Sequence, residues 1–121
     1  MAPPPLNIPK SQNVVSVSCI NTTTNMITTA ELLAQPVIPG YELWNMRTFA
    51  FLIENPKTGR KILFDCGARK DWWNLSPPVV KAIVDTSPAL QVEKGVHEIL
   101  EEGGTDLSTI DHIVWSHWHW E

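Results

Sequence analysis

The sequence predicts an α/β (α+β) domain in which strands form a sheet and at least one helix packs on it. Residues 48–54 and 61–65 are apolar, strand-like runs. The segment between them, 55–60, has the Asn, Pro and Gly content of a turn, so a hairpin is expected. Apolar residues recur at helical spacing over 92–100 and stop at two glycines, which predicts a helix. A third strand-like run covers 111–116.

The first strand of this hairpin is apolar on both sides. In an extended segment alternate side chains share a face. Phe49, Phe51 and Ile53 therefore lie on one face, and Ala50 and Leu52 lie on the other. This pattern predicts an interior strand of a sheet that is covered on both faces.

The other elements are marked by weaker signals. A short helix at residues 28–34 would be capped by Thr28 or Thr29, with Glu31 in its first turn. In chain order we expect a strand over 13–20, a polar turn over 21–25, that helix, a loop over 36–45, and a connection over 70–89 with one short helix near 79–84.

Residues 1–12 are expected to form a disordered or extended arm, and residues 13–121 a single partial domain. The arm contains several prolines and lacks the charged segment and apolar core of a secretory signal. No apolar run approaches the roughly 20 residues that cross a bilayer. Two cysteines are too few for a disulfide framework. We therefore expect a cytoplasmic protein that does not contact a membrane.

Composition excludes a nucleic-acid-binding protein. The formal charge is −4 and no basic stripe is present, whereas binding to a phosphate backbone needs clustered Lys and Arg. The remaining composition, with 43% hydrophobic and 18% charged residues, is that of an ordinary globular protein.

The main chemical signal is the pair His117 and His119. In an extended segment these side chains point the same way, with Cα atoms about 6.5–7 Å apart. Two imidazoles can then reach one ion with nitrogen–zinc bonds of about 2.0–2.1 Å. Trp118 and Trp120 face the other side, where they can pack. Two histidines at this spacing also occur as polar tips of a packed strand, so their context decides between the two interpretations.

That context resembles a known family. The run from Ile110 to Trp120 resembles the strand and loop that carry the H-x-H-x-D-H motif of the metallo-β-lactamase fold superfamily, and most closely that of the lactonase-like metallo-hydrolases. Asp65-Cys66-Gly67 matches the family's D-x-G, and the order of strand, hairpin, helix and strand is the same. The resemblance covers residues 45–121 and implies the N-terminal half of an αββα sandwich.

The resemblance also implies a chemistry, which is zinc-dependent hydrolysis of a cyclic ester (lactone) or a similar small carbonyl substrate. His117 and His119 would bind one of one or two Zn²⁺ ions, and Asp65 would support the site from behind. Glu121 stands where the family has Asp, and would bind the second ion or orient the attacking water. Trp72 and Trp73 are candidates for a substrate wall.

The sequence departs from the family motif at position 121, where Glu replaces Asp and no further His follows. We expect a fragment that is truncated inside the motif, binds zinc weakly, is inactive, and self-associates through an uncovered sheet face. Translation into an unspliced intron of a eukaryotic gene would explain both the Glu and the stop. Under this hypothesis the spliced product restores Asp at 121 and continues with His.

Two other function classes stay open. One is a non-catalytic half-domain that pairs with another polypeptide. The other is a metal-free packing module in which residues 117–120 form an aromatic strand. His97 is expected at the surface or edge of its helix, and His112 at the start of the final strand on the side away from the histidine pair, so neither is expected to be a ligand. Cys66 is expected to be a packed thiol rather than a nucleophile.

Overall fold

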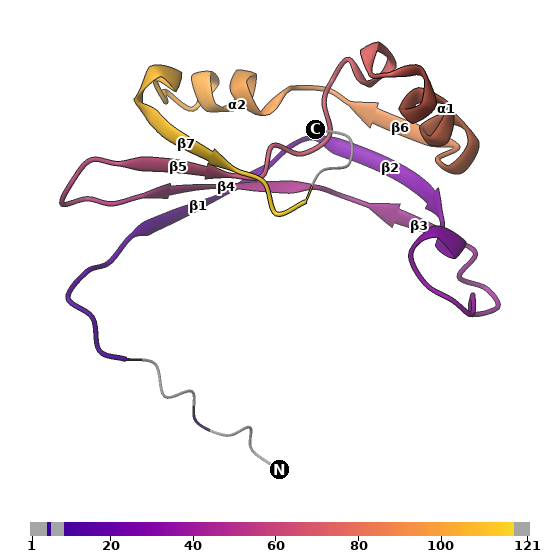
Figure 1. Cartoon of the computed structure of the whole chain (residues 1–121), viewed down its shortest axis with the longest axis horizontal. Coiled ribbons are helices and arrows are strands. Elements are labelled where there is room, and N and C mark those ends of the chain that lie inside the picture. Colours follow the sequence, from indigo (N-terminus) through magenta and orange to yellow (C-terminus); the bar gives the residue numbers. More distant parts are fainter. Residues whose placement is uncertain (1–4, 6–8, 118–121) are drawn as a thin grey trace.

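The computed structural model describes residue 5 and residues 9–117. It contains two sheets, two α-helices and short 3₁₀ helices, which confirms the α+β class (Figure 1). The elements in chain order are β1 (Ser16–Asn21), β2 (Thr24–Thr29), the 3₁₀ helix η1 (Ala30–Leu32), β3 (Leu43–Met46), β4 (Phe49–Glu54), β5 (Lys61–Phe64), the 3₁₀ helix η2 (Trp72–Asn74), α1 (Pro77–Thr86), β6 (Ala89–Val92), α2 (Val96–Glu102), the 3₁₀ helix η3 (Leu107–Thr109) and β7 (Ile110–Val114).

The larger sheet has the strand order β1-β4-β5-β7. Strands β4 and β5 form the predicted antiparallel hairpin, with Leu52 opposite Leu63. Strand β1 pairs antiparallel with β4, and β7 pairs in parallel with β5. The prediction that β4 is an interior strand is therefore confirmed, since it has a neighbour on each side.

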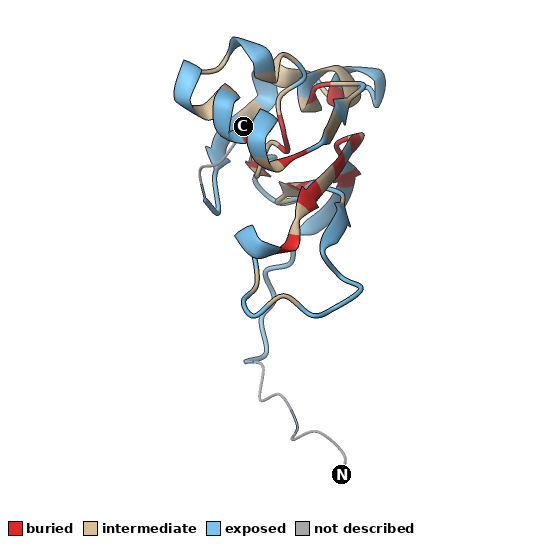
Figure 2. Cartoon of the chain, turned by 90° about the vertical axis from the view of Figure 1, so that its right-hand side faces the viewer, coloured by how far each residue is buried: buried red, intermediate tan, exposed pale blue. Residues whose placement is uncertain are grey.

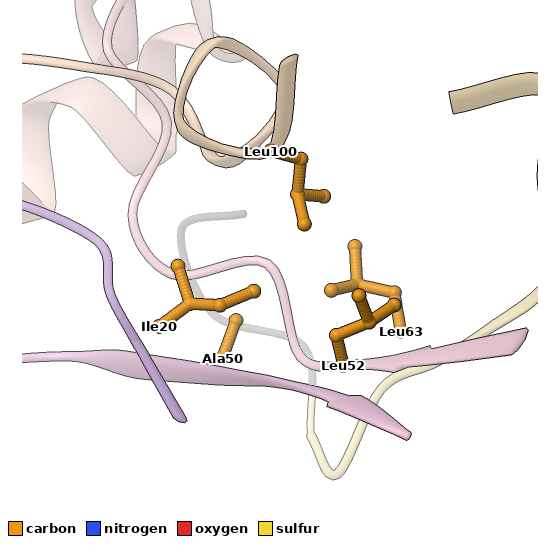
Figure 3. Close-up of a cluster of buried hydrophobic side chains, with 5 residues drawn as sticks. All are labelled: Ile20, Ala50, Leu52, Leu63 and Leu100. Atoms are coloured by element: carbon orange, nitrogen blue, oxygen red, sulfur yellow. The ribbon is translucent and has the colours of Figure 1, made fainter. Parts of the chain in front are cut away.

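One face of this sheet carries the core. Ile20, Ala50, Leu52 and Leu63 form a buried cluster with Leu100 of α2, which lies over them (Figure 3). Figure 1 shows α1 and α2 on the same side of the strands, and Figure 2 shows the buried residues mainly on the strands while the outer surfaces of the helices are exposed. Burial of these aliphatic side chains is the main source of stability in such a layer.

The opposite face is apolar but has no covering layer in the described part of the chain. Cross-strand pairing places Val17 beside Ile53, and Phe51 beside Phe64, on this face. Val17 is 58% exposed, and the rings of Phe51 and Phe64 lie 6.5 Å apart. The sheet was expected to be covered on both faces, but in the described residues only one face is covered. The N-terminal half of an αββα sandwich would have the same arrangement.

The smaller sheet, β3-β2-β6, corrects the prediction for residues 28–34. These residues were expected to form a capped helix, but β2 continues to Thr29 and only the short η1 follows. Strand β2 alternates buried and more exposed residues and pairs with strands on both sides, so tertiary pairing outweighs local helix signals. Strand β3 overlaps the end of the expected loop, and strand β6 begins at the last residue of the expected connection. Strand β6 also includes Val92, which was expected to lie in the helix, whereas α2 begins at Val96.

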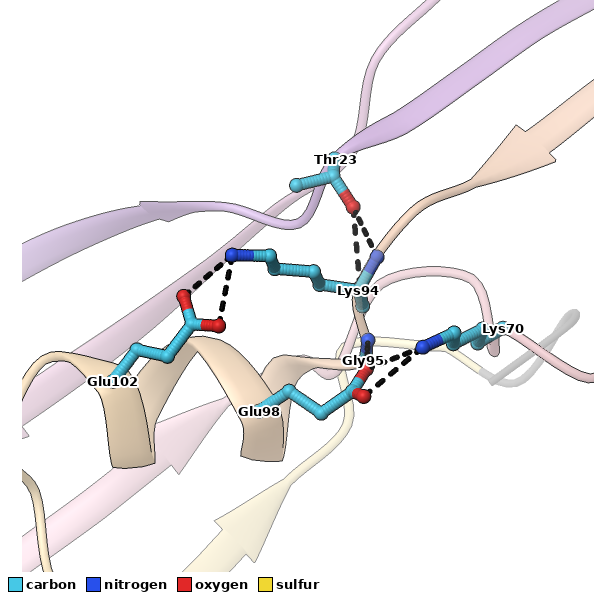
Figure 4. A network of polar contacts seen from close by, with 6 residues as sticks. All are labelled: Thr23, Lys70, Lys94, Gly95, Glu98 and Glu102. Carbon is cyan, nitrogen blue, oxygen red and sulfur yellow. Dashed lines mark hydrogen bonds and ion pairs between the residues drawn. The ribbon is translucent and has the colours of Figure 1, made fainter.

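Helix α2 is attached to the rest of the structure by polar contacts at its N-terminal end (Figure 4). The Lys94 N–H donates to Thr23 Oγ1 at 2.8 Å. The Glu98 carboxylate accepts from the Gly95 N–H at 2.7 Å and from Lys70 Nζ at 3.0 Å. These bonds fix α2 against the β1–β2 turn and against the segment that follows β5.

No helix among the described residues has the length and apolar content needed to pass through a bilayer.

Candidate metal-site pocket

Asp65 lies immediately after β5, where the chain leaves the sheet. Its backbone has φ 60°, a left-handed conformation that Asp adopts more readily than most residues. Its N–H donates to the Val114 carbonyl at 2.8 Å, so the parallel pairing with β7 extends one residue beyond β5. This backbone geometry directs the Asp65 carboxylate toward the residues that follow β7.

Both oxygens of that carboxylate bind Ser116. Asp65 Oδ1 accepts from the Ser116 N–H at 2.7 Å, and Oδ2 accepts from the Ser116 hydroxyl at 2.8 Å. Ser116 Oγ lies 2.9 Å from His117 Nδ1. Since the hydroxyl hydrogen is donated to Asp65, Oγ accepts from Nδ1–H, which places the lone pair of the neutral ring on Nε2. In metal sites the second ring N–H of a ligating histidine usually donates to a carboxylate, a backbone carbonyl or water, and here the Ser116 hydroxyl takes that place.

The D-C-G segment is held by close packing as well. Gly67 has φ +68°, and a Cβ atom at this position would lie 2.5 to 2.7 Å from the side-chain atoms of Thr22. Thr22 is itself fixed, because its hydroxyl donates to the Thr48 carbonyl at 2.9 Å. Cys66 Sγ accepts from the Trp115 indole N–H at 3.4 Å and packs against the core cluster. The packed-thiol interpretation of Cys66 agrees with these contacts.

An ion pair between Arg69 and Asp71 bridges the segment that follows Gly67. Arg69 Nε and its terminal nitrogen donate to the two oxygens of Asp71 at 2.7 and 2.8 Å. The hydrogen bond from the guanidinium is the main reason that the pKa of Asp71 falls to about 2, and it also raises the pKa of Arg69. This short bidentate clamp gives the loop after the D-C-G segment a defined shape.

A pocket of about 400 Å³ opens beside this arrangement. Asp65, Gly67 and His117 are among the residues that line it. The remaining lining residues come from the smaller sheet, from η1, from the start of β4 and from the adjoining chain segments, and most are apolar: Met26, Thr28, Leu32, Leu33, Met46, Thr48, Phe49 and Ala68. A concave apolar site of this size with a few polar groups at one end suits a small-molecule ligand.

Of the predicted metal ligands the structure describes His117. His119 and Glu121 lie outside the described residues. Within residues 9–117 no group of three His, Cys, Asp or Glu side chains gathers closely enough to hold an ion. The one ligand that is described fits zinc in its chemistry, because it is an imidazole oriented through a hydroxyl by a carboxylate.

Trp72 and Trp73 lie elsewhere. They form η2 and pack edge to face with ring centroids 6.1 Å apart, and neither lines the pocket beside His117. Their role as a substrate wall stays a prediction. His97 and His112 are exposed and line a different pocket, next to Leu100. Sequence reasoning missed Ser116 and the two methionines, Met26 and Met46, of the pocket.

Comparison with known proteins gives relatives but no structural match. No protein-family model and no solved structure matches the chain. The chain is 38% identical over 124 residues to gamma-lactamase FDB1 of Fusarium pseudograminearum, and the match covers 98% of this chain and 30% of the relative. The chain is 31% identical over 122 residues to metallo-hydrolase mfmC of Annulohypoxylon moriforme, and the match covers 98% of this chain and 32% of the relative.

A third relative has a different name. The chain is 35% identical over 123 residues to cytochrome P450 monooxygenase mpaDE of Penicillium roqueforti, but the match covers only 14% of that protein. Because the match covers a small part of that protein, the protein's name does not say what the matched residues do. The lactamase and metallo-hydrolase matches, together with the D-x-G and H-x-H segments and the fold, show that this chain belongs to the metallo-β-lactamase superfamily. It spans about a third of the length of these two hydrolase relatives.

Proposed function

We propose that this chain supplies part of the active site of a zinc-dependent hydrolase that opens a small cyclic ester or cyclic amide. The observation that carries this proposal is the Asp65–Ser116–His117 arrangement at one end of an apolar pocket. The relatives named gamma-lactamase and metallo-hydrolase support a carbonyl substrate and a metal. Lactones and lactams share the same chemistry, since water attacks a ring carbonyl in both.

Each residue has a distinct role in the proposed site. His117 and His119 would hold one zinc ion, and Glu121 would bind a second ion or orient the attacking water. Asp65 acts through Ser116 to fix the tautomer and orientation of the His117 ring, and is therefore a positioning residue. The bound metal would lower the pKa of a water molecule and polarise the substrate carbonyl. The apolar side of the pocket would exclude other water from the carbonyl.

Zinc binding tests this proposal. Titration of the purified chain against a chromophoric chelator should show one weakly bound ion per chain, and a His117→Ala/His119→Ala double variant should lose it. Asp65→Asn should weaken binding about 10- to 100-fold, because it disturbs the hydrogen bonds that orient His117. His97→Ala and His112→Ala serve as matched controls and should bind zinc like the parent. Equal binding by the double variant would favour the metal-free packing module instead.

Catalysis by these 121 residues alone should be near background. A catalytic zinc ion needs three protein ligands, whereas the proposed first site has two histidines here. Metal-dependent lactone or lactam hydrolysis by a monodisperse preparation, at more than about 1 s⁻¹, would contradict this expectation. It would mean that Glu121 or another residue completes the site.

A further inference from the structure

The pocket that Asp65 and His117 line has an apolar wall, which includes two flexible methionine side chains. Met26 of β2 and Met46 of β3 are direct cross-strand partners, so their side chains lie next to each other on the pocket side. Leu32 and Leu33 continue this wall from η1 and the residue that follows it, and Phe49 completes it at the start of β4. Unbranched methionine side chains adapt to ligands of irregular shape.

The hydroxyl groups in the wall are already committed to the protein. Thr28 Oγ1 donates to the Thr86 carbonyl at 3.1 Å, and Thr48 Oγ1 donates to Thr24 Oγ1 at 2.7 Å. Neither hydroxyl hydrogen is therefore directed at a ligand. These lining residues therefore present an apolar surface to a ligand in the pocket.

The charges that line the pocket also restrict the ligand. Among the described lining residues the ionisable ones are Asp65 and His117, and no Lys or Arg takes part. A carboxylate placed against the methionine wall would lose its hydration without gaining a cationic partner, which is costly. An apolar group in the same place would gain by leaving water.

We propose that this wall selects an uncharged substrate whose hydrolysed ring carries an apolar substituent, and that Met26, Met46 and Leu33 determine this specificity. The inference rests on the proposed function, in which the substrate carbonyl faces His117. The substituent then points away from His117 and lies against the two methionines. Substrates with a carboxylate at that position are disfavoured.

The chain offers a direct probe, because it has only three methionines, Met1, Met26 and Met46. In protein labelled with ¹³C at the methionine methyl groups, two signals report the wall and the Met1 signal is an internal control. Met26→Leu and Met46→Leu variants assign these signals. The ligands are 5-phenyl-2-pyrrolidinone, unsubstituted 2-pyrrolidinone and the anionic 5-oxoproline, which share the same lactam ring and carry a phenyl group, no group and a carboxylate at the same ring carbon.

We expect 5-phenyl-2-pyrrolidinone to shift the Met26 and Met46 signals saturably and to bind about tenfold or more tightly than 2-pyrrolidinone, as an added apolar group in a hydrophobic pocket does. The Met1 signal should not move, and 5-oxoproline should shift none of the three. Equal affinity for the phenyl compound and 5-oxoproline would overturn the proposal. So would shifts that are equally large at Met1.

A charge substitution gives a second test. Leu33→Lys places a cation in the wall and should weaken binding of the phenyl compound about tenfold while allowing 5-oxoproline to shift the methionine signals. Leu43→Lys is the matched control, since Leu43 is a leucine of similar exposure that does not line the pocket. Identical behaviour of the two variants, both folded by circular dichroism, would overturn the role of Leu33.

The outcomes also separate this inference from the proposed function. All titrations are repeated with EDTA, because the wall acts without a metal. Selective methionine shifts in a chain that binds no zinc would support the wall and reject the metal site. Zinc binding that depends on His117, without selective methionine shifts, would retain the metal site and reject the wall.

Discussion

The two faces of the four-stranded sheet have similar apolar side chains but very different surroundings. On the face under α2, Ala50 is fully buried and Leu63 is 3% exposed. On the other face, Val17 is 58%, Phe49 46% and Val114 42% exposed. Since neighbouring residues of the same strands supply both faces, composition does not explain the difference. What differs is the presence of a packed layer on one side only.

This contrast leaves an apolar face without a packed layer in the described part of the chain. Monomeric proteins rarely expose continuous apolar patches larger than a few hundred Å². Half of an αββα sandwich has such a face, where a second sheet would pack. Pairing with another polypeptide and self-association would both cover this face. Substitutions on the covered and on the uncovered face should therefore have different effects.

The largest effect is expected from truncation of a core side chain on the covered face. Leu52 is 6% exposed and packs in the cluster under α2, so Leu52→Ala should lower the free energy of unfolding by about 2–5 kcal/mol. Ile53, the next residue, points to the uncovered face and is only partly buried. Ile53→Ala should therefore cost less than half as much. Urea unfolding followed by tryptophan fluorescence measures both, and equal losses would show that the second face is covered in solution.

A smaller loss is expected at the D-C-G segment. Gly67→Ala combines a positive φ with a Cβ that would overlap the fixed Thr22 side chain, so it should cost about 1–3 kcal/mol. Gly59 in the β4–β5 turn has φ +71° but open space around it, and Gly59→Ala should cost about 1 kcal/mol from backbone strain alone. Thermal or urea unfolding compares the two variants. A Gly67→Ala loss no larger than that of Gly59→Ala would contradict the close packing of this loop.

Charges on the uncovered face should change association rather than stability. Val17 and Val114 lie on the two edge strands of the sheet and are exposed, so lysine at both positions should alter the free energy of unfolding by no more than about 0.5 kcal/mol each. The parent should elute from size-exclusion chromatography as an oligomer and bind an apolar dye. The Val17→Lys/Val114→Lys variant should elute smaller and bind less dye.

Val84→Lys is the control for this experiment, since Val84 of α1 is 61% exposed and lies away from that face. It should behave like the parent. A parent chain that is already a compact, dye-silent monomer would show that the exposed face is not an association surface.

The sequence allowed prediction of elements with strong local patterns. The hairpin β4–β5, helix α2 and strand β7 follow from strict periodicity and turn residues. The helix near residues 79–84 was expected and is longer, as α1. Strand β3 could not be predicted, because it has four residues and its pairing partner β2 lies far from it in sequence. Pairing of this kind depends on tertiary context.

Prediction of the site residues from the sequence was limited in the same way. His117 was found through the spacing of the histidine pair and Asp65 through the resemblance to the family's D-x-G, and the structure brings both to one pocket. Ser116 carries no sequence signal beyond its position before His117, although it makes the contact between them. Met26 and Met46 lie about 20 residues apart from each other and far from His117, and only the fold of the smaller sheet brings them there. Nothing in the described residues tests His119 or Glu121.

The smallest effect on stability is expected from pH, which acts on the Arg69–Asp71 ion pair in the segment after Gly67. Hydrogen bonds from Arg69 lower the pKa of Asp71 from its usual 3.8 to about 2. Because the pKa is lower in the folded state, this pair stabilises the fold above about pH 3.8, and the contribution is lost as pH falls toward 2. Both side chains are exposed to solvent, so the effect on stability should be small. Carboxyl-detected NMR should show Asp71 titrating near 2 in the parent and closer to 3.8 in Arg69→Gln, whereas Arg60→Gln, in the β4–β5 turn, should leave it unchanged. An Asp71 that titrates near 3.8 in the parent would mean that the clamp does not form in solution.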